Sequence, residues 1–196
     1  MIENKTGNEI TKLYIKNMVC PRCIEAVQNI LDNENIKYLQ VDLGEVTLSE
    51  KLSNDKLNKI STSLKNKGFE LLQNKSEKII NIIKSSIIHA IYSNDYDNRI
   101  NISEYLSNKT NHDYSYISSL FSSTMGITIE QYYIKQKIER VKELLIYDEL
   151  SLKEISYKLN YSSVAHLSRQ FKKITGLTPG EFKKLGVPKR KTLDSI

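Results

Sequence analysis

The second half of the chain contains an internal repeat at an offset of 50 residues, which sharply limits the folds it can adopt. The segment 117–121 (ISSLF) aligns with 167–171 (LSRQF), and 126–128 (GIT) aligns with 176–178 (GLT). Further matches pair 131–132 with 181–182 and, after a one-residue shift, 106–107 with 155–156. Repeated apolar and glycine positions indicate that one supersecondary unit occurs twice.

Each copy predicts a short helix, a turn of about four polar residues and a second helix, which is the helix-turn-helix pattern. The two copies span about 98–128 and 148–183, and a long helix over 129–147 joins them. The second helix of each copy has an expected core stripe: Ile117, Leu120, Phe121 and Thr124 in the first, and Leu167, Phe171 and Ile174 in the second. Asp113 and Ser162 stand where N-caps are needed.

The duplicated pattern resembles the DNA-binding domain of AraC/XylS-type transcription regulators over about residues 80–186. The strongest stretch is 151–179, SLKEISYKLNYSSVAHLSRQFKKITGLTP, which keeps the Thr-Gly-x-Thr-Pro ending of the family signature. Two departures are Ser156 and Ser107 where the family usually has Ala, and Asn160-Tyr161 where it usually has Gly-Phe. The resemblance implies a transcription regulator that binds double-stranded DNA.

Helical geometry predicts which side chains would meet a major groove, because the face opposite the core stripe is the one that DNA can approach. Charge supports an anionic partner: residues 169–191 hold eight basic residues and one acid. The simpler alternative at any single position is a polar side chain that only faces water. The predicted DNA-binding residues are Ser115, Ser118, Ser119, Ser122, Ala165, Ser168, Arg169, Lys172 and Lys173.

The first half of the chain alternates strand-like and helix-like patterns. Strands are expected around 13–15, 39–43, 46–48 and 69–72, with a turn at Gly44, and helices around 24–31 and 57–64, the second ending at Gly68. The order predicts a ferredoxin-like βαββαβ domain over 1–74. A helix with a wide isoleucine stripe follows at 79–91 and begins an all-α domain over 75–196, so the fold class is α+β.

The segment 18–23 (MVCPRC) matches the Met-x-Cys-x-x-Cys motif of heavy-metal-associated domains, which the N-terminal half resembles. One departure is Asn17, which stands where the family usually has Gly before Met. Met18 is expected in the core. Two soft sulfurs, Cys20 and Cys23, favour Cu(I) or another thiophilic metal ion, since zinc normally takes four ligands. A helix N-terminus and Arg22 are expected to lower the thiol pKa values. A role in homodimerisation without metal and a thiol-redox role remain open as alternatives.

Composition excludes several classes of protein. No apolar run exceeds four residues, so no membrane span is expected, and the basic-poor, polar N-terminus predicts a cytoplasmic protein. No catalytic constellation and no phosphate-binding glycine loop is present, so no enzyme activity is expected. The sequence predicts a DNA-binding transcription regulator that requires no cofactor, with a thiophilic metal as its candidate signal. The alternative is a metal-trafficking or thiol-redox protein whose helical half binds a protein.

Overall fold

The computed structural model describes residues 11–93 and 101–185. The chain divides into two compact units, residues 1–86 and 87–196, and each is described below by itself. The unit boundary lies inside helix α3 (Lys75–Tyr92), whereas the change of sequence pattern lies at the start of that helix. The predicted domain limits, 1–74 and 75–196, therefore stay a prediction.

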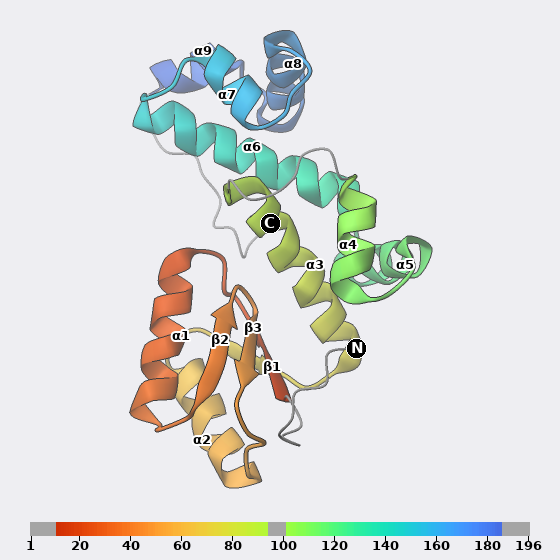
Figure 1. Ribbon diagram of the computed structural model, residues 1–196. Coiled ribbons are helices and arrows are strands. Elements are labelled where there is room, and N and C mark those ends of the chain that lie inside the picture. Colours follow the sequence, from red (N-terminus) through yellow and green to blue (C-terminus); the bar gives the residue numbers. More distant parts are fainter. Residues whose placement is uncertain (1–10, 94–100, 186–196) are drawn as a thin grey trace. The chain divides into compact units, whose positions relative to one another are not determined.

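The first unit has the predicted order of strand, helix, strand, strand, helix, strand (Figure 1). Its described strands form one sheet in the order β2-β3-β1-β4, and each pair of neighbours is antiparallel. Figure 1 shows α1 and α2 on the same side of this sheet. The elements are β1 (Thr11–Lys16), α1 (Pro21–Asn33), β2 (Tyr38–Asp42), β3 (Glu45–Leu48), α2 (Asn54–Lys65) and β4 (Glu70–Leu72).

The core of the first unit lies between the sheet and these two helices. Residues two apart on a strand and three or four apart on a helix share a face, and the apolar positions follow those periods. Burying each large aliphatic side chain contributes about 1.5–3 kcal/mol. Met18 is buried, as expected. The apolar residues of the predicted strands and helices that are buried include Leu13, Ile15, Val27, Ile30, Leu31, Val41, Val46, Leu48, Ile60 and Leu64.

One predicted strand residue, Leu39, does not follow the alternation. Regular alternation over the predicted strand 39–43 would place it on the face of Val41, but 64% of it is exposed. The register between β2 and β3 shifts between Tyr38 and Gln40, so Leu39 is the extra residue of a β-bulge. A bulge reverses the face of the residue it inserts, which a pattern of alternation cannot reveal.

The first turns of α3 are fixed to the sheet by Asn81, a buried polar side chain. Its Nδ2 donates to the carbonyl of Ile15 at 3.2 Å and to the carbonyl of Gly44 at 3.1 Å. Gly44 has a φ of +79°, and a Cβ there would lie 2.6 Å from Asn81 Nδ2. Glycine is therefore required at this hairpin position for two reasons: the turn is left-handed, and α3 approaches it too closely for a Cβ.

The second unit is helical throughout its described part and contains two helix-turn-helix units, as predicted. The first consists of α4 (Ile102–Thr110) and α5 (Tyr114–Met125), and the second of α7 (Leu152–Lys158) and α8 (Val164–Thr175). The long helix α6 (Ile129–Tyr147) joins them at the predicted limits, and α9 (Pro179–Lys184) follows α8. No helix in 11–93 or 101–185 is both long and apolar enough to cross a membrane.

The repeat in the sequence is also a repeat in the packing. Phe121 packs edge-on against Tyr132, with ring centroids 5.5 Å apart. Fifty positions later along the sequence, Phe171 packs edge-on against Phe182, also at 5.5 Å. Each pair joins the second helix of one copy to the helix that follows it, α6 or α9. The two copies therefore have equivalent small cores, each strengthened by an aromatic contact of about 0.5–1.5 kcal/mol.

Candidate nucleic-acid interface

The C-terminal ends of α5 and α8 are fixed by the same device. Gly126 ends α5 with a φ of +69°, and Gly176 ends α8 with a φ of +80°. Two residues later, Thr128 and Thr178 begin α6 and α9, each with a capping box that satisfies helix N–H groups reciprocally. The length and direction of α5 and α8 are thus determined by residues outside their exposed faces.

On α8, the predicted DNA-binding residues lie mostly in solvent. Ala165, Arg169, Lys172 and Lys173 are exposed, and Ser168 is half-buried at the edge of the same face. Arg169 Nε donates to the carbonyl of Ala165 at 3.4 Å, within the helix. This face combines small and basic side chains, a composition that suits close approach to a polyanion.

On α5, the equivalent face is uncharged. Ser115 and Ser119 are exposed one helical turn apart, while Ser118 and Ser122 are half-buried. The hydroxyl groups of serines can donate to or accept from either base edges or phosphates. The structure therefore brings the predicted residues of each copy onto one helix face, but gives the two faces different chemistry.

Several predictions about these helices were wrong in detail. Thr124 and Ile174, both near the C-terminal end of their helix, were expected in the core but are exposed. Ser162 is not the N-cap of α8: Ser163 is, and its Oγ accepts from the backbone N–H of His166 at 3.1 Å. Asp113 is the N-cap residue of α5, as predicted, but its side chain makes no capping hydrogen bond.

Two exposed aromatic side chains on the same helices were not predicted as site residues. His166 is exposed on α8, and Tyr116 is exposed at the equivalent position of α5. Each lies three residues before a predicted residue, Arg169 or Ser119, so helical spacing places them on the same face. Both directly follow a predicted residue of the first turn, Ser115 or Ala165, so the sequence signal that could have found them is an aromatic side chain beside the predicted face.

The turn before α8 holds that helix by side-chain contacts. Tyr161 is buried, and its hydroxyl donates to Gln170 Oε1 on α8 at 2.8 Å. Asn160, which replaces the usual Gly of the family, has a φ of +52°. Asn is one of the few residues besides Gly that adopts this left-handed conformation at small cost, so the departure preserves the turn.

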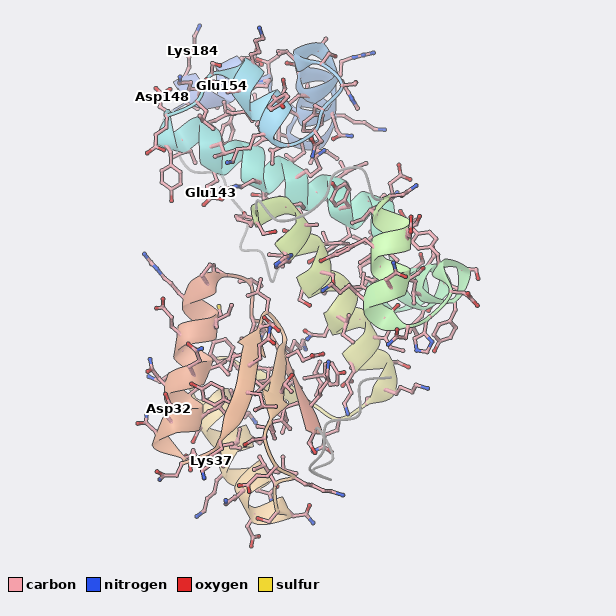
Figure 2. The ribbon with its side chains drawn as sticks, viewed as in Figure 1. Asp32, Lys37, Glu143, Asp148, Glu154 and Lys184 are labelled. Atoms are coloured by element: carbon pink, nitrogen blue, oxygen red, sulfur yellow. The ribbon has the colours of Figure 1, made fainter. Side chains whose placement is uncertain are left out.

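Basic residues continue onto α9. Lys183 forms an ion pair with Asp148 at the end of α6, whereas Lys184 is exposed and points outward (Figure 2). Lys172 and Lys173 lie in the last turn of α8. The residues of the basic run beyond Leu185 lie outside the described residues.

The two cysteines of the first unit lie together at the start of α1. Cys20 is the N-cap residue, Cys23 is in the first turn, and their Sγ atoms are 3.4 Å apart. Both side chains are half-buried and neither forms a disulfide. Asn17 has a φ of +72° and donates from Nδ2 to the carbonyl of Gly68 at 2.9 Å, so it adopts a left-handed conformation that Gly and Asn tolerate best.

The expected lowering of the thiol pKa values was wrong for Cys23. Burial is the largest effect there and raises its pKa, because a thiolate loses hydration in this position. Within the described residues, no group of three or more His, Cys, Asp or Glu side chains could hold a metal ion. The local chemistry offers two sulfur ligands and does not form a four-coordinate zinc site.

Two helix-turn-helix units around a connecting helix define a double helix-turn-helix DNA-binding domain. Residues 106–185 match the family model described as "Helix-turn-helix domain". Residues 106–185 are thus a helix-turn-helix domain. The resemblance of 151–179 to AraC/XylS-type regulators is supported by the transcription regulators among the relatives of the chain.

Relatives of the chain are transcription regulators and not enzymes, in agreement with the sequence prediction. It is 29% identical over 101 residues to the uncharacterized HTH-type transcriptional regulator YtdP of Bacillus subtilis, covering 52% of this chain and 13% of that protein. It is 22% identical over 192 residues to the melibiose operon regulatory protein of Escherichia coli K12, covering 98% and 62% respectively. The chain thus spans less than two thirds of the length of these relatives.

The chain is also similar to solved protein structures. The C-terminal domain of AraT, a response regulator from Geobacillus stearothermophilus, superposes with a TM-score of 0.49 and 21% identity, over 61% of this chain and 95% of that one.

Proposed function

We propose that this protein is a transcription regulator that binds double-stranded DNA through α5 and α8, each lying in a major groove. The observation that carries the proposal is the duplicated helix-turn-helix architecture, in which the two second helices expose polar or basic faces from equivalent positions. Such helices present side chains of their first turns to base edges while neighbouring residues contact the backbone.

The two faces would have different roles in sequence recognition. Arg169 has the fork of donors that pairs with guanine, and Ala165 leaves room for α8 to approach the base pairs. Lys172 and Lys173 would neutralise phosphates, whereas Ser115 and Ser119 on α5 would make weaker contacts. Ser118, Ser122 and Ser168, at the edges of the faces, complete the proposed DNA-binding set.

The test begins with selection of tight-binding duplexes from a randomised pool by the purified full chain, followed by fluorescence anisotropy on the selected site. Replacing both Lys172 and Lys173 by Glu should weaken binding to every duplex. It should also reduce the slope of log Kd against log salt by about 1.8, since each phosphate contact contributes about 0.9.

A matched control for the charge reversal is the pair Lys65→Glu and Lys67→Glu, because both residues are exposed on the first unit. This control variant has the same net charge and should bind DNA nearly as the wild type does. Equal affinities for the wild type and the α8 variant, or failure of the selection to enrich any sequence, would contradict the proposal.

For the first unit we propose a ferredoxin-like domain, 1–74, that binds one Cu(I) through Cys20 and Cys23. The strand order β2-β3-β1-β4 and the βαββαβ element order support this fold. The 3.4 Å separation of the two half-buried sulfurs supports a shared ligand, and Cu(I) accepts two thiolates. The metal would supply a signal, and DNA affinity would change only if Cu(I) binds the two DNA-affinity states unequally.

Titration of the reduced full chain with Cu(I) against a chelator of known affinity tests the site directly. One equivalent should bind to the wild type and none to the Cys20→Ser, Cys23→Ser variant, while DNA binding without metal stays unchanged. Absence of stoichiometric binding would remove the metal proposal and favour homodimerisation through this unit, to be measured by sedimentation. We place the protein in the cytoplasm, where thiols stay reduced and DNA is accessible.

A further inference from the structure

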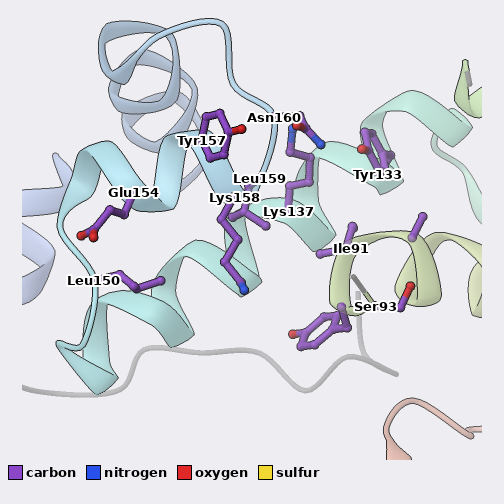
Figure 3. A pocket seen from close by; sticks show the side chains of 12 residues that line it. Ile91, Ser93, Tyr133, Lys137, Leu150, Glu154, Tyr157, Lys158, Leu159 and Asn160 are labelled. Carbon is purple, nitrogen blue, oxygen red and sulfur yellow. The ribbon is translucent and has the colours of Figure 1, made fainter. Parts of the chain in front are cut away.

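The second unit contains a cavity of about 580 Å³ beside the second helix-turn-helix unit (Figure 3). Its walls come from the end of α3, from α6 and from α7, all within residues 87–196. The polar groups that line it are mainly hydrogen-bond donors or groups that can donate, and Ile91 and Leu159 contribute apolar surface. The lining residues used below are Tyr133, Lys137, Tyr157, Lys158 and Asn160.

Lys137 is the unusual member of this lining, because it is a lysine that is only 8% exposed. Its Nζ lies 4.0 Å from the ring centroid of Tyr161 and 5.5 Å from that of Tyr133. Among the residues that the structure describes, no carboxylate forms an ion pair with it. Two ring faces compensate a buried ammonium less completely than an anion does.

The carboxylate that lines the same cavity is already engaged. Glu154 accepts from the backbone N–H of Ser151 at 2.7 Å and from the Ser151 hydroxyl at 2.6 Å, as part of the capping box of α7. These hydrogen bonds lower the pKa of Glu154, so its charge stabilises the helix end. The cavity therefore contains a lysine ammonium without a carboxylate partner among the described residues, while its own carboxylate, Glu154, is occupied in the capping box of α7.

We infer that this cavity binds a small oxyanion, a carboxylate or a phosphate monoester, with the Lys137 ammonium as its main partner. Lys158 on the rim adds a second positive charge, and the Asn160 amide and the Tyr157 hydroxyl supply neutral donors. Figure 3 shows the Lys137 side chain extending from α6 toward Asn160. Burial lowers the pKa of Lys137 to about 8, so its amine is still mainly protonated at neutral pH.

The same lysine connects the cavity to α8. Its ammonium lies over the ring of Tyr161, and the Tyr161 hydroxyl donates to Gln170 on α8. An anion in the cavity would draw the ammonium away from this ring and loosen the turn that positions α8. Bound oxyanion should thus weaken DNA binding, a consequence that rests on the DNA-binding function proposed above.

Calorimetric titration of the full chain without DNA tests the site by itself. The probes are inorganic phosphate, glucose 6-phosphate and citrate, which separate a bare phosphate, a phosphate ester and a carboxylate. At least one should bind saturably, and Lys137→Met should weaken that binding by tenfold or more. Lys158→Met, a change at an exposed residue, should weaken it several-fold, and the matched control Lys135→Met on α6 should leave it unchanged.

Absence of saturable binding by all three probes up to about 10 mM, or equal affinity in wild type and Lys137→Met, would overturn the inference. The regulatory part is measured afterwards, as DNA affinity with and without the bound probe. We expect at least a threefold loss in the wild type and none in Lys137→Met; an unchanged or increased affinity would overturn the coupling. Because the titration uses no DNA, a cavity that binds no oxyanion can be distinguished from a protein that does not bind DNA.

Discussion

Replacing Lys137 by Met should stabilise the protein at neutral pH. Burial lowers the lysine pKa from 10.5 to about 8, a difference of about 2.5 units. At about 1.4 kcal/mol per unit, the folded state then bears a cost of roughly 3.5 kcal/mol for the buried charge. Loss of the cation–π contact with Tyr161 offsets up to about 2 kcal/mol of the gain. Met fills similar space, so the free energy of unfolding should rise by about 1 kcal/mol or somewhat more.

The difference should depend on pH in a defined direction. The folded-state pKa is lower than the unfolded one, so the native lysine loses its proton first as pH rises. Wild-type stability from this group therefore increases between about pH 8 and 10.5, and the advantage of the Met variant shrinks over the same interval. Titrations elsewhere in the chain are common to both proteins and cancel in the comparison.

Urea unfolding followed by far-UV circular dichroism at pH 7.0 and 9.5 measures both effects. Lys135→Met is the control, because Lys135 is a half-buried lysine of the same helix; its change should stay within about 0.5 kcal/mol. Two results would refute this reasoning: a free energy of unfolding for Lys137→Met that is lower than the wild type's by about 1 kcal/mol or more at pH 7, or a difference between the two proteins that does not vary with pH. Either would show that the ammonium is not an uncompensated buried charge.

Two further predictions concern other parts of the chain. Arg169→Ala should cost about 1–3 kcal/mol of discrimination at one or two base pairs of a selected site, and Ser119→Ala should cost less. Fluorescence anisotropy on single-mismatch duplexes measures both losses. An equal or larger loss from the serine variant would reverse the assignment of roles. Gly44→Ala should lower the free energy of unfolding in urea by more than the roughly 1–2 kcal/mol of a left-handed alanine, because its Cβ meets Asn81. Gly68→Ala has open space around the new Cβ, so it should cost only that backbone strain. Equal losses would show that the Asn81 contact is unimportant.

Much of the helical half could be predicted because its information is local and occurs twice. The match of 117–121 with 167–171 predicted two equivalent packed helices, and the aromatic pairs Phe121–Tyr132 and Phe171–Phe182 confirm it. The long helix has the predicted limits because apolar spacing and a Thr cap define its start. Element order in the first unit followed from alternation and from Gly44 and Gly68 for the same reason.

What could not be predicted depends on neighbours distant in sequence or on the exact register of a strand. The bulge at Leu39 is a property of the pairing with β3, and the Ser163 cap differs from the predicted Ser162 by one residue. Lys137 lies among polar residues in the sequence, and only the packing of α3, α6 and α7 makes it a buried cation in a cavity. Likewise, desolvation of Cys23 requires the three-dimensional surroundings, so its pKa shift had the opposite sign to the expected one.

The shared glycine and threonine ends of α5 and α8 have a consequence for how such proteins diversify. Because Gly126 with Thr128, and Gly176 with Thr178, define the two helices, substitutions on the outward faces leave the scaffold intact. One copy can therefore carry an arginine and lysines on its outward face while the other carries serines, without loss of stability in either. If α5 and α8 contact DNA as proposed, each half of an operator can change independently, so that a related protein gains new target genes while it retains part of the original site.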